Sequence, residues 1–503
     1  MSGGAGIIRA GTGSGSSGGA RSAFGEQLVA ELTPKVQLQF PYNINTAQVV
    51  AFPGNGGSVT NGNGHANCST GTAADGFAFI ISHDVLKYNS GQGALFRGDC
   101  IFTTGVADST QIIGVGNNLN GYFFGYNGAD FGVLRRRGGQ PETRTLTVTT
   151  GSSTAENITI TLDGDAIATV AVTASSDVTV TAREISEAFY ASVGTGWGAI
   201  LRGDKVEFIS FDTADHDGVY SITATTAAGT YAQTIDANAA TDSWIPQASW
   251  NVDKFNGRGA SGMTLDTTKG NEYKISYQWG YGDIEFSIEN PHTGDFALAH
   301  RIEYSNANTD SSIAQPSLRL FMEAVNSGGT TDLTMKSSSM AGFIEGREMN
   351  LGPRHGADNI LDIGTGIIEE PILTIRNKQI YQSHINEVRI VLESLTLSSD
   401  LGINGSTTFR IYQDASPENG TSYSDINSSG SVVEYDTDAA DFDIGNADLL
   451  ETFILGRTDS EAFRLGDTRD QLAPGCTIMV TAQPSKSHAD NAVGASINWR
   501  ELF

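Results

Sequence analysis

The sequence has little cysteine, little charge and few basic residues. Its 503 residues contain only Cys68, Cys100 and Cys476. An odd and sparse set does not make a disulfide framework, so we expect free and mostly buried thiols. Charged residues make up 17% of the chain, and Lys+Arg 30 against Asp+Glu 57 gives a net charge of −27. A chain this acidic repels nucleic acid, which argues against binding to a genome through a basic face.

Long hydrophobic runs are also missing. No apolar run approaches the ~20 residues that cross a membrane, so we expect no membrane partner. Residues 1–6 lack the basic and apolar regions of a signal peptide. We therefore expect synthesis in a cytoplasm, followed by assembly.

Glycine and small polar residues are abundant instead. The 60 glycines occur together with many Thr, Ser and Asn residues. This composition is typical of short strands joined by tight turns, and it predicts a mainly β protein rather than a helical enzyme. The length is enough for roughly three domains of ~150 residues.

The stretch Asn120–Arg137 predicts an aromatic β-hairpin. Its first strand contains Tyr122, Phe123, Phe124 and Tyr126. Asn127-Gly128 supplies the turn, because both residues adopt positive φ at little cost. A hairpin this hydrophobic needs neighbouring strands and a second sheet to cover it.

Strand patterns divide the chain into several units. Two stretches rich in short strands read as halves of one β-sandwich, separated by a small α+β unit inserted at a loop, where insertions cost little closure entropy. A Gly/Pro-containing linker and a last antiparallel β-sandwich, of jelly-roll or immunoglobulin size, follow. The expected boundaries are 26–140 plus 244–346 for the first sandwich, 141–243 for the insert, 347–370 for the linker and 371–503 for the C-terminal sandwich.

Residues 1–25 form a Gly/Ser-rich arm with Arg9 and Arg21 and no acidic residue. The arm is either a disordered tail or a segment that threads into a neighbouring subunit. In the insert, Thr181 and Glu184 have the spacing of a capping box and predict that a helix begins at Thr181.

Segments 121–136 (GYFFGYNGADFGVLRR) and 144–148 (RTLTV) resemble a pattern in structural proteins of tailed phages and large DNA viruses. The insert is similar to a small module of phage tail and fibre proteins. Segment 271–279 (NEYKISYQW) resembles the second half of a concanavalin-like, lectin-type sandwich. The resemblance covers roughly 120–345. It implies a virion subunit of capsid, tail-fibre or appendage type and, more weakly, sugar binding.

Paired carboxylates matter because concanavalin-like sandwiches include glycoside hydrolases. Asp283, Glu285 and Glu289 alternate on one predicted strand, but their order departs from the Glu-x-Asp-x-x-Glu motif of laminarinase-type enzymes. Only Asp283 and Glu285 could approach the ~5 Å separation that a retaining mechanism needs. We therefore expect a solvated strand face and no enzyme.

Two acidic clusters could instead bind calcium through several oxygens. The first contains Asp436, Asp438, Asp441 and Asp443, and the second spans 212–217. Neither has the spacing of an EF-hand, so solvated acidic loops are the alternative.

Exposed aromatic residues are candidates for stacking on sugar rings. Such residues are Tyr122, Tyr126, Trp279 and Tyr281, and core packing is the alternative for all of them. The basic run Arg135–Arg137 either pairs with an acidic partner at a subunit interface or is a solvated strand end.

These observations predict a concanavalin-like β-sandwich with a small α+β insert, followed by a second sandwich. The predicted function is that of a viral structural protein, made in the host cytoplasm and located in the virion. Its partners would be other virion proteins, further copies of the chain and host glycans, with no cofactor apart from calcium. The alternatives are a cellular carbohydrate-binding or surface-adhesion protein and a divergent glycoside hydrolase.

Overall fold

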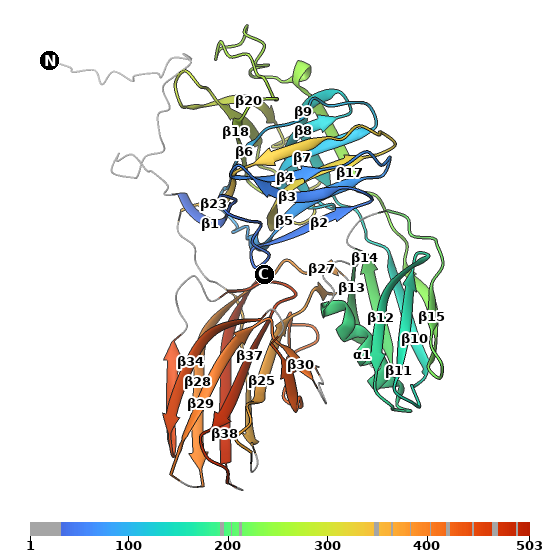
Figure 1. Ribbon diagram of the computed structural model, residues 1–503. Coiled ribbons are helices and arrows are strands. Elements are labelled where there is room, and N and C mark those ends of the chain that lie inside the picture. The colour runs from blue at the N-terminus through green and yellow to red at the C-terminus, as the bar shows by residue number, and fades with distance from the viewer. Residues whose placement is uncertain are drawn as a thin grey trace, which may run out of the picture.

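The computed structural model describes residues 32–191, 196–202, 204–210, 214–346, 352–363, 366–382, 384–402, 404–418, 423–444, 447–464, 471–488 and 491–503. The chain forms two β-sandwiches and a smaller α+β domain (Figure 1). The Gly/Ser-rich arm 1–25 lies outside the described residues. No helix in the described part of the chain is long and apolar enough to cross a membrane.

The N-terminal sandwich packs a six-stranded antiparallel sheet against a seven-stranded one. The first sheet has the order β1 (Leu32–Gln39), β23 (Ser339–Glu345), β6 (Ala94–Cys100), β18 (Asn271–Tyr277), β19 (Ile284–Glu289) and β20 (Phe296–Ile302). The second has the order β17 (Thr241–Pro246), β9 (Asp130–Arg137), β8 (Gly121–Asn127), β7 (Ser109–Gly116), β21 (Leu318–Asn326), β5 (Phe77–Leu86) and β2 (Val49–Gly54). A third, small sheet consists of β22 (Thr334–Ser337), β4 (His65–Ser69) and β3 (Ser58–Gly62). This is the two-layer architecture of a concanavalin-like sandwich.

Aromatic rings from both halves of the sequence fill the space between the two large sheets. The ring of Tyr122 lies 5.1 Å from that of Tyr277, and Phe124 lies 4.9 Å from Tyr273. Segments on either side of the insert therefore share one core. The hairpin turn is shifted by one residue: Asn127 pairs with Asp130, so Gly128 and Ala129 form the loop, and Gly128 has φ +61°.

The inserted domain has two small sheets and the helix α1 (Val178–Ala191). One sheet is β13 (Trp197–Arg202), β14 (Lys205–Ser210), β10 (Thr143–Thr150) and β16 (Ala228–Ile235). The other is β12 (Asp165–Val172), β11 (Glu156–Leu162) and β15 (Ser221–Thr223). Ile185 and Phe189 bury the apolar face of α1 in the core of the domain.

The start of α1 differs from the capping box expected at Thr181. Asp177 caps the helix, because its Oδ1 accepts a hydrogen bond from the backbone N–H of Thr179 at 2.9 Å. The Thr181 hydroxyl instead accepts from the N–H of Ser152, and Glu184 accepts from the N–H of Thr173. The helix begins four residues before Thr181 because the Asp177 carboxylate reaches the free N–H groups of the first turn.

The C-terminal domain is a second sandwich. One sheet has the order β24 (Arg354–Asp362), β38 (Asn491–Leu502), β28 (Arg389–Leu401) and β35 (Asp459–Arg464), and β36 (Gln471–Leu472) also pairs with β28. The other has the order β31 (Ser424–Asp425), β32 (Val433–Asp436), β25 (Glu370–Asn377), β37 (Thr477–Pro484), β29 (Ser406–Gln413) and β34 (Asp448–Gly456). Short pairs are formed by β26 (Ile380–Tyr381) with β27 (His384–Ile385), and by β30 (Ser416–Glu418) with β33 (Asp441–Asp443).

The segment 347–370, expected to be a linker, contains a strand. Residues of β24 pair with β38 along their whole length, from Arg354 opposite Arg500 to Asp362 opposite Ala492. β24 alternates exposed and partly buried side chains. It therefore lacks the continuous apolar pattern of a central strand, which is why its sequence resembles a linker.

The cysteines are free thiols, as expected from their number. Cys68 and Cys100 are buried and Cys476 is partly buried. Burial raises the pKa of the Cys68 thiol, which keeps it protonated.

Candidate ligand-binding cleft

The seven-stranded sheet carries apolar side chains on both faces. Tyr122 and Phe124 of β8 point into the sandwich core, so Phe123 between them points to the outer face. A separate apolar cluster covers that outer face, and its members are Ile112, Phe123, Leu134 and Phe321 with the partly buried Phe79, Ile81 and Trp244. Ile112, Phe123, Leu134 and Phe321 are at most 1% exposed, so this part of the outer face is already covered within the chain.

Five phenylalanine rings form a continuous row across the outer face. Phe123 lies 5.9 Å from Phe321, and Phe321 lies 5.9 Å from Phe79. The row continues from Phe79 to Phe77 at 6.4 Å in a stacked arrangement, and to Phe52 at 5.5 Å. Phe52, Phe77 and Phe79 are only partly buried, so ring surface remains open at the β2 end of the sheet.

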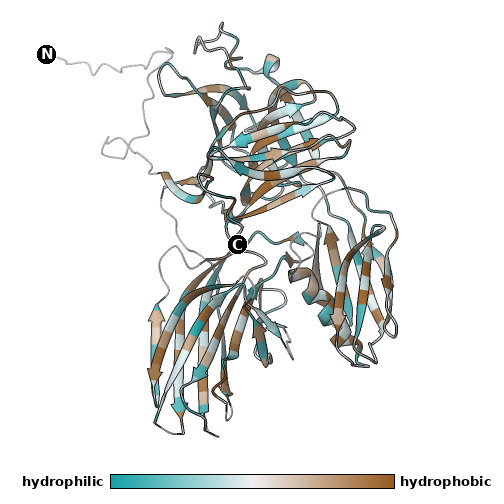
Figure 2. Cartoon of the chain, in the orientation of Figure 1, coloured by the Kyte–Doolittle hydropathy of each residue, from teal (hydrophilic) through white to brown (hydrophobic). Residues whose placement is uncertain are grey.

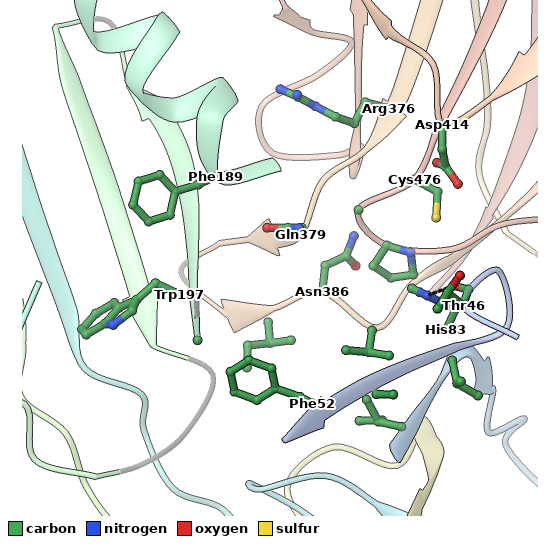
Figure 3. Close-up of a pocket in the computed structure, with 18 of the residues that line it drawn as sticks. Thr46, Phe52, His83, Phe189, Trp197, Arg376, Gln379, Asn386, Asp414 and Cys476 are labelled. Carbon is green, nitrogen blue, oxygen red and sulfur yellow. Dashed lines mark hydrogen bonds between the residues drawn. The ribbon is translucent and has the colours of Figure 1, made fainter. Parts of the chain in front are cut away.

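These open rings line a cleft where the three domains meet (Figure 3). The cleft has a volume of about 2060 Å³. Figure 3 shows Phe52 on the sandwich side, Phe189 and Trp197 on the insert side, and Arg376, Gln379, Asn386, Asp414 and Cys476 on the side of the C-terminal domain. Every domain therefore contributes a wall.

An arginine–aspartate pair borders the row of rings. Arg136 of β9 donates from Nε and Nη2 to the two carboxylate oxygens of Asp242 on β17, each at 3.0 Å. Its guanidinium also lies 5.8 Å from the centroid of the Phe123 ring. This bidentate ion pair places charged groups beside an aromatic ring.

An ion pair joins the sheet to the C-terminal domain. Arg319 of β21 donates to Glu387 at 2.7 Å and to the carbonyl oxygens of Ser82 and His83. Asn117 donates to the other oxygen of Glu387 at 3.4 Å. Burial raises the pKa of the Glu387 carboxyl and Arg319 opposes that shift, whereas burial and then Arg319 lower the pKa of His83.

A second ion pair joins the insert to the C-terminal domain. The buried Arg376 of β25 donates to Glu187 of α1 and to Glu434 of β32, with distances of 3.0 Å and 2.7 Å for its Nη2 and Nε atoms. The ring of Tyr423 lies 3.6 Å from the guanidinium carbon. Arg376, Glu187 and Tyr423 also line the cleft, so this contact between two of its walls borders the space between them.

The structure places two of the four tyrosine and tryptophan candidates for glycan binding inside the core. Tyr122 is fully buried and donates to the Ser312 hydroxyl at 2.8 Å, and Tyr126 is hydrogen bonded to Thr267 at 2.7 Å. Buried rings cannot stack on a sugar, so the core alternative holds for both. Trp279 is partly buried and donates to the carbonyl of Ile313, and Tyr281 is 50% exposed. None of the four lines the cleft.

The three carboxylates considered for a glycosidase belong to the other large sheet. Glu285 accepts a bond from Arg301 Nη2 at 2.7 Å, and Asp283 accepts one from the backbone N–H of Tyr304. They and Glu289 lie on or beside β19 and do not line the cleft. Their contacts are those of a strand surface.

The carboxylates of the first acidic cluster, considered for calcium, do not form a metal site. Asp436 accepts hydrogen bonds from the N–H groups of Asp438 and Ala439, as in a turn, and Asp441 accepts from Phe442. Asp443 pairs through its backbone with Ser416. Among the described residues, no group of three or more acidic, histidine or cysteine side chains is arranged to hold a metal. The second cluster, 212–217, is only partly described, and its Asp217 pairs with Arg144 at 3.0 Å.

The basic run Arg135–Arg137 makes contacts within the chain. Arg135 lies over the ring of Tyr304 at 5.3 Å, Arg136 pairs with Asp242, and Arg137 lies 3.6 Å from Asp310. The run is therefore not a purely solvated strand end, and a role at a subunit interface stays a prediction.

Sequence reasoning missed the phenylalanine row. The strand signal at Phe77–Ile81 was visible as a continuous apolar run, which indicates burial on both faces. Phe52 and Phe321 gave no comparable signal, because their neighbours in the row come from distant parts of the chain.

No protein-family model and no curated protein sequence matches the chain. Solved structures with a similar fold include peanut lectin with a nine-residue peptide, at 9% identity, a TM-score of 0.26, and coverage of 61% of this chain and 97% of the lectin. The exoplasmic/lumenal domain of VIP36 in its Ca²⁺- and Man3GlcNAc-bound form is 11% identical, with a TM-score of 0.25 and coverage of 64% of this chain and 93% of that domain. A glycosyl hydrolase family protein from Mycobacterium fortuitum is 9% identical, with a TM-score of 0.24 and coverage of 62% of this chain and 99% of that protein. At these low scores, the fold assignment rests on the two sheets of the sandwich.

Proposed function

We propose that the protein binds a carbohydrate chain, without cleaving it, on the outer face of the seven-stranded sheet. The observation that carries the proposal is the row of phenylalanine rings, which opens into the cleft at Phe52, Phe77 and Phe79. Sugar rings present flat C–H surfaces that pack on aromatic rings, and their hydroxyl groups need polar partners. Arg136, Asp242 and Asn117 lie in the same cleft and provide such partners.

The size of the cleft favours an extended ligand. Sites for small molecules usually measure ~300–1,000 Å³. This cleft, at about 2060 Å³, is larger and has walls from three domains. An oligosaccharide or polysaccharide segment fits such a space, because successive sugar units can contact the partly open rings of Phe52, Phe77 and Phe79.

Binding without cleavage is proposed because of how the carboxylates on this sheet are placed. Glu323 of β21 and Asp242 of β17 line the cleft, and four strand spacings separate them in the sheet order. At ~4.8 Å per spacing, their backbones are about 19 Å apart across the sheet. The carboxyl pairs of glycosidases lie ~5–9.5 Å apart, so these two strand positions do not favour such a pair.

An array of immobilised oligosaccharides, followed by titration of the strongest hits, tests the proposal. Replacing Phe79 or Phe52 by alanine should weaken binding by at least ~10-fold, which corresponds to about 1.4 kcal/mol. Tyr42→Ala is the matched control, because that ring is 91% exposed and does not line the cleft. Circular dichroism checks that each variant folds.

Three outcomes would contradict the proposal. They are an array without saturable hits, equal binding by Phe79→Ala and Tyr42→Ala, and release of reducing ends from a bound glycan. The last result would favour the glycoside hydrolase alternative.

The location of the protein in a virion stays a prediction. Carbohydrate binding on this face would serve attachment equally on a virus particle or on a cell surface. Mass spectrometry of purified particles would check the virion location, and absence of the chain from particles would favour the cellular adhesion alternative.

A further inference from the structure

The inserted domain is joined to the N-terminal sandwich by two short segments of small residues. On the insert side, the backbones of Gln140 and Asn238 exchange hydrogen bonds at 2.8 and 2.9 Å. Between that pair and the sheet of the sandwich, one chain segment is Gly138-Gly139 and the other is 239–240, two alanines. Gly138 and Gly139 have φ values of +66° and +116°, which other residues resist. The connection is therefore narrow, and its backbone can adopt conformations that larger residues disfavour.

The insert has a hydrophobic core of its own. Its sheets and α1 enclose a separate apolar cluster that includes Leu146, Ile160, Phe189 and Phe208. In Figure 2, the strands of the insert carry both brown and teal residues, as expected for sheets that bury one face and expose the other. A domain with its own core and a narrow connection can turn as a unit.

The insert also touches the C-terminal domain. Figure 1 shows α1 on the side of the insert that faces this domain. There, both Nη atoms of Arg376 donate to the two carboxylate oxygens of Glu187, at 2.5 and 3.0 Å. The Glu187 side chain is 26% exposed, so water reaches the pair. β13 lies next to β26, so the contact combines an ion pair with one pair of neighbouring strands.

Arg376 has further partners within its own domain. Its Nε donates to Glu434 at 2.7 Å, and its guanidinium carbon lies 3.6 Å from the ring centroid of Tyr423. Breaking a buried ion pair is costly when one charge loses its only partner. Arg376 would keep a carboxylate and an aromatic ring after losing Glu187. Separation of the two domains would therefore leave no unpaired buried charge at this contact.

We propose that the inserted domain is a lid on the cleft: it turns about segments 138–139 and 239–240, and the Glu187–Arg376 pair latches it against the C-terminal domain. Glu187, Arg376 and both alanines of segment 239–240 line the cleft, so the latch and the connection border the space that the lid would open or narrow. Domain closure about a few residues that absorb the backbone change is a common way to admit and hold a ligand. The role in ligand entry rests on the proposed function, whereas the movement itself does not.

Pulsed electron paramagnetic resonance between two spin labels tests the movement without any glycan. The labels are attached to Asp165→Cys in the insert and Ser460→Cys in the C-terminal domain, since both positions are exposed. All samples carry Cys476→Ser, because that native thiol is only partly buried. We expect one short distance for the chain with Glu187. Glu187→Lys should shift the distribution to longer and broader distances, because the lysine would repel Arg376.

Glu184→Lys is the matched control for the latch. Glu184 lies on the same helix, but it accepts hydrogen bonds from the N–H and hydroxyl of Thr173 within the insert. This variant should keep the short distance. About 1 M NaCl should lengthen the distance in the chain with Glu187, because salt screens the ion pair, and should change Glu187→Lys little. Circular dichroism checks that each variant folds.

The double variant Gly138→Ala/Gly139→Ala tests the hinge. Alanine is strained at the positive φ values of the latched state, so this variant should populate the longer distances even with Glu187 present. Gly164→Ala is the control, because Gly164 has φ +89° in a hairpin turn of the insert, away from the hinge. It should leave the distribution unchanged.

Several results would overturn the proposal. Identical distributions for Glu187→Lys and the chain with Glu187 would do so, as would an equal shift in Glu184→Lys or a distance that does not respond to salt. Equal effects of Gly164→Ala and the double alanine variant would exclude the hinge at Gly138-Gly139. None of these results decides whether the cleft binds a glycan, which the oligosaccharide array tests separately.

Discussion

The two faces of the seven-stranded sheet have similar composition but different surroundings. On the inner face, the Tyr122 and Phe124 rings pack against Tyr277 and Tyr273 of the opposite sheet. On the outer face, Phe123 and Phe321 are equally buried, but the row they start continues to the partly open Phe79 and Phe52. An aromatic strand can therefore serve a core and a candidate binding surface at once, and side-chain type alone does not separate the two roles.

The largest expected difference between the faces concerns stability. Phe124→Ala should lower the free energy of unfolding of the sandwich by about 3–5 kcal/mol, because it leaves a cavity in a closed core. Phe79→Ala should cost clearly less, since its ring is only partly buried. Urea unfolding followed by tryptophan fluorescence measures both values. Equal losses would mean that the outer face is packed as tightly as the core.

The next effect concerns the ion pair between the outer face and the C-terminal domain. Arg319→Ala should destabilise the protein by about 3 kcal/mol, because it leaves the buried Glu387 carboxylate without its cation. Arg301→Ala is the matched control on the other large sheet, where the partner Glu285 is 37% exposed. That substitution should cost less than about 1 kcal/mol. Similar costs for the two variants would show that burial does not set the strength of the Arg319 pair.

The smallest effect is a pH dependence at the border of the cleft. His83 is hydrogen bonded to the Thr46 carbonyl, and its pKa is lowered by burial and by Arg319, against weaker opposing effects of Thr46, Asp414 and Asp84. A lowered folded-state pKa gives stability that is present above the ordinary value of about 6.5 and is lost as pH falls through the folded-state value. His83→Gln should therefore reduce the loss of thermal stability between pH 7 and pH 5. Parallel melting-temperature profiles for wild type and variant would contradict this.

The sequence predicts the sandwich well because its signals are local. Gly128 marks the hairpin within one residue of its true turn, and the alternating segment 271–277 forms a strand that pairs antiparallel with β19. The helix start was missed because Asp177 and Thr181 are both good capping residues, and only the packed domain decides between them. β24 was missed because an edge strand needs no continuous apolar pattern.

The candidate cleft was beyond sequence reasoning for a different reason. Tyr122 and Tyr126 were candidates for sugar stacking, whereas the open rings belong to Phe52, Phe77 and Phe79. When both faces of a strand are apolar, alternation does not reveal which face meets the core. The walls of the cleft also come from three domains, and no local pattern predicts how separate domains are placed against one another.

The ends of the inserted domain lie side by side in the sheet, because Arg137 at the end of β9 pairs with Thr241 at the start of β17. A short turn could bridge these two positions, so the whole module behaves as an exchangeable cassette. Because the inserted domain supplies one wall of the cleft, replacing it would change the shape of the cleft and leave the row of phenylalanine rings unchanged. Evolution, or an engineer, could thus change ligand preference by swapping a domain rather than by redesigning a sheet.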